Sequence, residues 1–197
     1  MEPEHLIHSS VEFISTHYSP LSDECKTRFS KHLSVATYTE NTVLVKEGQY
    51  SDKLFFVASG STRAYYLKEG KNITDWFGFE NDFICAINSY FLNIPSPHFI
   101  ETIEASTVLS ISRHHVNELC DTFHDFERLA RLATTQTMLR LQQRIVSLQF
   151  ESAQQKYESL TALRPDIVQR VPLGHIASYL GMTLETLSRV RQPKKRI

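Results

Sequence analysis

The chain has 197 residues, of which 41% are hydrophobic and 22% charged, and its formal net charge is −1. This length suffices for one large or two small domains with proper cores, and the composition excludes a chain that is disordered throughout. The three cysteines, Cys25, Cys85 and Cys120, form no C-x-x-C pair, which predicts reduced thiols and excludes a disulfide framework or a zinc ribbon. There is no apolar run of about 18 residues and no signal-peptide pattern, so we expect a cytoplasmic protein without a membrane partner.

Helical periodicity opens the chain. Apolar residues recur at helical spacing over residues 4–18, Ser19-Pro20 interrupts the pattern, and Ser22 is placed to cap a second helix that runs to about Leu33. The period then changes to that of short strands separated by glycine turns. We expect strands at residues 42–45, 54–58, 62–67, 72–77, 99–104 and 107–112, which predicts a small antiparallel sandwich or jelly roll.

Residues 113–163 again have a helical pattern, which is too long for a single helix and predicts two or three. One stripe of apolar residues repeats every seven positions: Leu132, Leu139 and Val146. A second stripe contains Met138, Leu141, Ile145 and Leu148. The first is suited to a dimer interface and the second to packing on the C-terminal module, although either could be ordinary core.

Residues 171–191 predict a helix, a tight turn and a second helix. Pro172 suits a first helical position, Gly181 suits the turn, and Thr183 is placed to cap the second helix. This arrangement is typical of a helix-turn-helix, whose second helix enters the DNA major groove, although an ordinary helical hairpin has the same spacing. The charge distribution favours the DNA-binding interpretation. Residues 156–197 carry eight basic and three acidic side chains, whereas residues 1–155 carry 13 basic and 19 acidic ones. A basic tail that only improves solubility would give the same balance.

The order of elements resembles the Crp/Fnr family of bacterial transcription regulators. Four segments carry the resemblance: Val45–Gly48, Leu54–Gly60, Asn81–Ile84 and, most specifically, Gly181–Arg189. The short length and the ending Ser188–Arg191 look most like the compact members common in Bacteroidetes.

The resemblance implies an α+β fold and a regulator that is not an enzyme. It places a cyclic-nucleotide-binding-like sensor domain at residues 1–122, an antiparallel jelly roll flanked by helices. A dimerisation helix at 123–150 and a DNA-binding helix-turn-helix at 151–197 would follow. The implied partners are double-stranded DNA, a second copy of the chain and an unknown small-molecule effector, and the family leaves room for a contact with RNA polymerase.

For DNA, the resemblance assigns specific roles to the second helix of the helix-turn-helix. Glu185 and Arg189 would read bases, and Leu184 stands where several members carry a base-reading arginine. The remaining candidates would contact phosphates or base edges: Thr183, Thr186, Ser188, Arg191, Lys194 and Lys195.

The sequence departs from the family where cyclic nucleotides bind. Cys85 and Ala86 replace the Gly-Glu pair, and Ser96 replaces the arginine that holds the cyclic phosphate. Burying a phosphate charge without such donors is costly, so we expect no cAMP response by the usual mode. An iron–sulfur sensor is also excluded, because only Cys25 lies near the N-terminus.

Residues 87–98 replace the phosphate-binding segment. They could line a pocket for another small molecule, with Asn88, Ser89, Ser96 and His98 as polar contacts and Arg63 or Trp76 nearby. The alternative is a degenerate loop packed on a ligand-free sandwich.

We expect no metal and no cofactor. Of the clustered histidines, His114 and His115 are adjacent on a predicted helix and should project about 100° apart. Two rival functions remain: a sensor whose helical end contacts protein instead of DNA, and a cupin-type enzyme, for which the strands lack a His/Glu metal cluster. Both rivals are testable, the first by a gel shift and the second by metal analysis.

Overall fold

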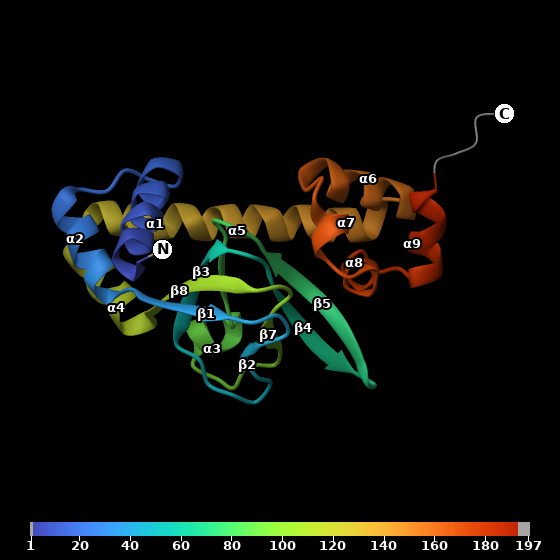
Figure 1. Ribbon diagram of the computed structural model, residues 1–197, viewed down its shortest axis with the longest axis horizontal. Coiled ribbons are helices and arrows are strands. Elements are labelled where there is room, and N and C mark those ends of the chain that lie inside the picture. The colour runs from blue at the N-terminus through green and yellow to red at the C-terminus, as the bar shows by residue number, and fades with distance from the viewer. Residues whose placement is uncertain (1, 193–197) are drawn as a thin grey trace.

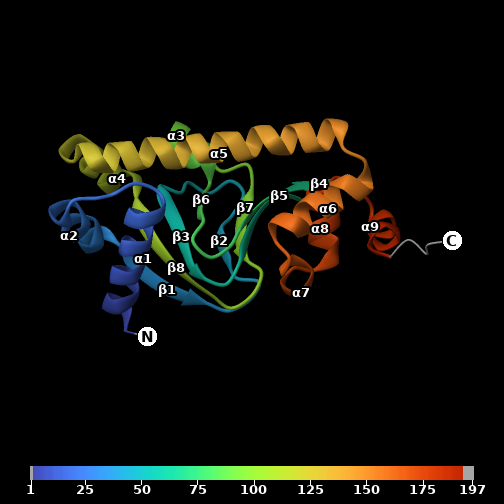
Figure 2. The same ribbon diagram turned by 90° about the horizontal axis from the view of Figure 1, so that it is seen from above.

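The computed structural model describes residues 2–192 and is organised along one long helix, α5 (His124–Phe150) (Figure 1). The β-sheets lie against the middle of α5. Helices α1 (Pro3–His17), α2 (Asp23–His32) and α4 (Arg113–Thr122) gather at its N-terminal end, and the C-terminal helices gather at the other. The turned view shows α5 passing across the whole molecule (Figure 2).

The strands form two four-stranded antiparallel sheets. The first has the order β1 (Ser34–Tyr38), β8 (Ser106–Ser112), β3 (Lys53–Ser59) and β6 (Phe83–Cys85). The second has the order β2 (Val43–Val45), β7 (Phe99–Thr102), β4 (Thr62–Lys68) and β5 (Lys71–Gly78). Val57, Ile100 and Val108 are fully or almost fully buried between them. The predicted α+β fold with an antiparallel jelly roll is confirmed.

Three short elements differ from the sequence expectation. Strand β1 contains no buried residue, and β6 has only three residues, so neither has the alternation that identifies a strand. Both lie at sheet edges and are strands because β8 and β3 pair with them. Helix α3 (Ile87–Leu92) occupies part of the segment that was expected to replace the phosphate-binding loop.

The N-terminal helices form as expected. The Ser22 hydroxyl accepts from the Cys25 N–H at the start of α2, which satisfies one of the unpaired donors of the first turn. Val11, Ile14, Phe29 and Leu119 then bury their side chains in one cluster that joins α1, α2 and α4.

After β8, the predicted helical stretch is divided into α4, α5 and α6 (Ala153–Leu163). Three short helices follow: α7 (Ile167–Arg170), α8 (Leu173–Tyr179) and α9 (Leu184–Arg191). We refer to α6–α9 as the C-terminal module. Across residues 2–192, no helix combines the length and the hydropathy that a membrane span requires.

Candidate DNA-binding surface and ligand cavity

Helices α8 and α9 meet at the turn predicted from the sequence. Gly181 has a φ of +65°, a conformation that glycine adopts without the steric cost of a Cβ. The Thr183 hydroxyl accepts from the Thr186 N–H and thereby caps α9. Pro172 differs from its expected role, because its backbone is extended and it precedes the first turn of α8.

One side of α9 is fixed in a core and the other faces solvent. Leu187 is fully buried against Ile176 and Ala177 of α8, and Val190 packs at the edge of the same cluster. The candidate DNA contacts lie outside this core: Thr186 is half-buried, and Thr183, Leu184, Glu185, Ser188, Arg189 and Arg191 are exposed. Lys194 and Lys195 lie outside the described residues. The helix therefore presents a polar surface with two arginines from a rigid base.

The C-terminal module is held against both the roll and α5. The Ser178 hydroxyl of α8 accepts from the Thr74 N–H at 2.9 Å and donates to the Asn72 carbonyl at 3.1 Å. These bonds pair backbone groups along the edge strand β5, which within residues 2–192 has β4 as its one neighbour in the sheet. Arg144 of α5 donates to the Tyr179 carbonyl at 2.8 Å and lies 3.9 Å from the centre of the Tyr179 ring. Three elements thus meet at α8.

Arg170 makes the strongest ionic link between the module and the roll. Its guanidinium donates to both carboxylate oxygens of Glu80, at 3.0 and 2.5 Å, and to Glu104 and Asp166. Burial alone would raise the pKa of Glu80, but the hydrogen bond from Arg170 holds it below its ordinary value. Arg164 lies 4.0 Å from the centre of the Phe79 ring and also pairs with Asp166. Two of the basic residues counted toward DNA binding are therefore engaged within the protein.

A cavity of about 830 Å³ lies between α5 and the roll. Its wall is mostly apolar, with Ile84 and Phe83 from β6, Tyr90 from α3, and Leu141 and Ile145 from α5. Burial raises the pKa of the Cys85 thiol in this wall to about 12, so that side chain is neutral. The chemistry of the wall favours an uncharged or largely apolar ligand.

Two buried polar side chains in the cavity wall have no hydrogen-bond partner among the described residues. The Tyr90 hydroxyl and both ring nitrogens of His98 are unpaired, and the two residues are 4% and 2% exposed. Burial lowers the pKa of His98 and raises that of Tyr90, so both groups are neutral. An unpaired buried polar group costs about 1–3 kcal/mol, which a bound ligand could recover.

The structure brings together only part of the predicted pocket. Trp76 and His98 line the cavity, but Asn88, Ser89 and Ser96 are not in its wall. Ser89 accepts from the Ser51 N–H, and the Ser96 hydroxyl donates to the His98 carbonyl. Sequence analysis missed Tyr90, because no local pattern indicates that residues 87–92 form a helix with this side chain buried.

Arg63 was expected near the pocket, but it lies elsewhere. Its guanidinium, 3% exposed, binds Glu101 at 2.6–2.7 Å, donates to the Thr74 hydroxyl and stacks on Tyr65. His175 of α8 is close enough that Arg63 contributes to the lowering of its pKa, after the larger effect of burial. The register between β4 and β7 creates this pair, by placing Arg63 opposite Glu101.

The residues that replace the family's phosphate-binding residues are also buried. Ala86 is completely buried in the roll, and Ser96 is 1% exposed and hydrogen-bonded within its loop. Arg113 borders the cavity, but it donates to the Tyr90 carbonyl and to Asn93. This geometry offers no free cationic fork to a cyclic phosphate at these positions.

The second half of α5 exposes an unusual amount of apolar surface. Leu139, Ile145 and Val146 are 51%, 55% and 41% exposed. Leu132 is half-buried. Exposed apolar side chains gathered on one part of a helix are typical of an interaction surface.

Comparison with known proteins agrees with this architecture. The model of the cyclic nucleotide-binding domain family matches residues 35–123. The nitrogen fixation regulation protein FixK of Rhizobium meliloti is 29% identical over 174 residues, which cover 79% of this chain and 72% of that protein.

Solved structures extend the similarity to the fold. FixK2 from Bradyrhizobium japonicum has a TM-score of 0.68 at 18% identity and covers 80% of this chain and 82% of its own. The c-di-GMP responsive global regulator CLP of Xanthomonas campestris has a TM-score of 0.65 at 17% identity, and the match covers 86% of this chain and 89% of that one. The catabolite activator protein of Thermus thermophilus has a TM-score of 0.56 at 17% identity, and the match covers 90% of this chain and 84% of that one.

Proposed function

We propose that this chain belongs to the Crp/Fnr family and is a cytoplasmic transcription regulator that binds double-stranded DNA as a homodimer. The observation that carries the proposal is the outer face of α9, which exposes Glu185, Ser188 and Arg189 while Leu187 anchors its inner face. A helix held in this way can enter the major groove without losing its support. The proposal divides the chain at residues 1–122, 123–150 and 151–197 into sensor domain, dimerisation helix and DNA-binding module.

Arg189 is the proposed centre of base recognition. Its side chain is exposed on α9 and its guanidinium lies 3.4 Å from the Thr186 hydroxyl, which supports it without neutralising its charge. An arginine fork can bind both major-groove acceptors of guanine, and each such pair contributes about 1–3 kcal/mol of discrimination. Glu185 would accept from a cytosine amino group, and Thr183, Thr186, Ser188 and Arg191 would position the helix on the backbone.

The test is a selection of binding sites from random DNA with wild type, Arg189→Ala and the matched variants Lys194→Ala and Lys195→Ala. Arg189→Ala should weaken binding and relax the preference at one position in each half-site. The lysine variants should retain the motif and each reduce the slope of log affinity against log salt by about one unit, because they only displace counterions. An unchanged motif from Arg189→Ala would contradict the assignment.

The proposed dimer interface is the exposed apolar face of α5. Parallel pairing of two such helices would bury Leu139 and Val146 and place two copies of α9 at the same end of the dimer, as a two-fold DNA site requires. In helix-turn-helix dimers of this kind, half-sites lie about 34 Å apart, or one helical turn of DNA.

We further propose that the cavity between α5 and the roll binds an effector that is largely apolar and carries at least one hydrogen-bonding group. Tyr90 and His98 would supply its polar contacts, and Trp76 would contact its apolar part. Because α5 forms one wall, a bound ligand would act directly on the proposed dimerisation helix. Screening apolar metabolites by quenching of Trp76, the single tryptophan, tests this proposal, with His98→Phe as the control expected to lose binding.

One observation favours a second function, in which the module contacts protein. Leu184, at the start of α9, is 53% exposed and apolar, although it stands where the Crp/Fnr resemblance implies a base-reading arginine. A low-salt gel shift with genomic fragments separates the two functions, because protein contact alone predicts no retarded band.

A further inference from the structure

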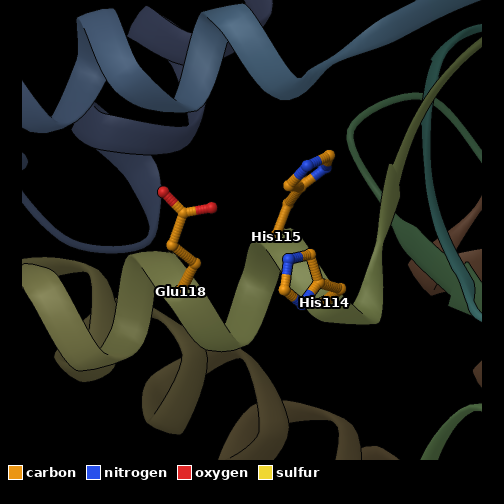
Figure 3. A group of neighbouring side chains, drawn as sticks. All are labelled: His114, His115 and Glu118. Atoms are coloured by element: carbon orange, nitrogen blue, oxygen red, sulfur yellow. The ribbon is translucent and has the colours of Figure 1, made fainter.

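Three potential metal ligands lie together on the first turns of α4 (Figure 3). Each of His114, His115 and Glu118 offers a ligand atom, and these three atoms lie within 4.8 Å of one another. Glu118 is four residues after His114 and three after His115, so one helical turn brings all three to neighbouring positions. Although adjacent histidines on a helix project in different directions, their ligand atoms lie within 4.8 Å of each other here.

A third imidazole, and a fourth candidate ligand, approaches from a different helix. His32, the last residue of α2, stacks on the His115 ring with centroids 4.0 Å apart. Its Nε2 lies 3.8 Å from Glu118 Oε2 and has no hydrogen-bond partner among the described residues, although it is buried.

Contacts around the cluster orient two of its side chains. His115 Nδ1 lies 3.1 Å from the Ser112 hydroxyl, and a proton on Nδ1 leaves Nε2 with its lone pair. Arg28 donates to Glu118 Oε1 at 3.1 Å, which leaves Oε2 directed toward His32. The positive charge of the Arg28 guanidinium would repel a metal ion bound nearby, but its hydrogen bond also holds the Glu118 carboxylate in place.

We propose that His32, His114, His115 and Glu118 form a binding site for one divalent ion of the zinc class, such as Zn²⁺, Co²⁺ or Ni²⁺. Imidazole and carboxylate together suit these ions, whereas Mg²⁺ and Ca²⁺ prefer oxygen ligands alone. Zinc bonds to such ligands are about 2.0–2.2 Å long, so the side chains must move closer to one another, and the exposed His114 can turn inward. The ion would join the end of α2 to the start of α4, which packs on α5.

The test titrates the full-length, untagged protein with Zn²⁺ by calorimetry and with Co²⁺ by visible absorption. We expect about one ion per chain and a cobalt spectrum without thiolate charge transfer, because Cys120 is not a ligand. His115→Ala and Glu118→Gln should each lower the affinity by at least about tenfold. The matched control, His5→Ala with His8→Ala, removes two exposed histidines from α1 and should leave the affinity unchanged.

Thermal unfolding gives a second measurement that does not depend on the spectrum. Zn²⁺ should raise the Tm of wild type and of the His5/His8 control, and should raise it less in Glu118→Gln, a variant that keeps the shape of the side chain. Absence of Zn²⁺ binding by wild type would overturn the proposal. So would an affinity that falls in the His5/His8 control and stays unchanged in His115→Ala and Glu118→Gln.

Discussion

Replacement of Arg170 by methionine tests whether one guanidinium fastens the C-terminal module to the roll. The substitution keeps most of the aliphatic stem and removes the charge that binds Glu80, Glu104 and Asp166. Three carboxylates would remain near one another, with Arg164 as the nearby cation at 3.6 Å from Glu80 and 3.1 Å from Asp166. Like-charge repulsion and loss of hydrogen bonds should both weaken the contact.

The expected magnitude follows from the exposure of the side chains. Breaking a buried ion pair costs about 3–5 kcal/mol, and an exposed pair contributes about 0–1 kcal/mol. Arg170 is 21% exposed and its partners are 33–40% exposed, so this network lies between the two limits. We expect Arg170→Met to lower the free energy of unfolding by about 2 kcal/mol. The Arg140 side chain, which pairs with Asp82, is 51% exposed, so Arg140→Met should lower the free energy of unfolding by less than about 1 kcal/mol.

The measurement is urea denaturation of wild type, Arg170→Met, Glu80→Gln and the double variant, with Trp76 fluorescence and circular dichroism as probes. The double-mutant cycle should give a coupling of about 1–2 kcal/mol between residues 80 and 170. Hydrogen exchange should increase in β5 and α8 if the contact opens locally. A coupling below about 0.5 kcal/mol, with exchange unchanged in β5 and α8, would refute the reasoning.

The remaining predictions concern the dimer, the nucleotide and pH. Leu132→Asp with Leu139→Asp should give monomers in sedimentation that bind DNA poorly, and a wild type that sediments as a monomer at micromolar concentration would exclude the α5 interface. Calorimetry should detect no tight binding of cAMP or cGMP, because Ala86 and Ser96 are buried and carry no charge; micromolar affinity with competition between the two would contradict this. Burial lowers the pKa of His98 in the folded protein, so the His98 ring binds a proton more readily in the unfolded chain. The contribution of His98 to the free energy of unfolding should be full above the ordinary pKa of about 6.5 and decline as the pH falls below that value. The slope for this histidine should reach at most about 1.4 kcal/mol per pH unit in urea denaturation, and His98→Asn should reduce it; an equal slope in the variant would assign the effect to other groups.

The sequence alone determined the features that depend on near neighbours in the chain. Period-two alternation and glycine turns located six of the strands, because strand faces repeat every second residue. Ser22 and Thr183 marked helix starts, because a cap bonds to an N–H three residues later. Gly181 and the apolar residues at helical spacing on both sides of it identified the paired helices α8 and α9, because a turn and a helical face also depend on near neighbours in the chain.

Tertiary structure alone decided which polar residues are available for function. Arg170 looked like part of a basic DNA-binding tail, but its partners Glu80 and Glu104 lie 90 and 66 residues away in sequence. Arg63 looked like a pocket residue, but the register of β4 against β7 pairs it with Glu101, 38 residues away. Such pairs follow from how sheets and helices pack, and a buried charge must find a partner wherever the fold places one, which no local pattern in the chain records.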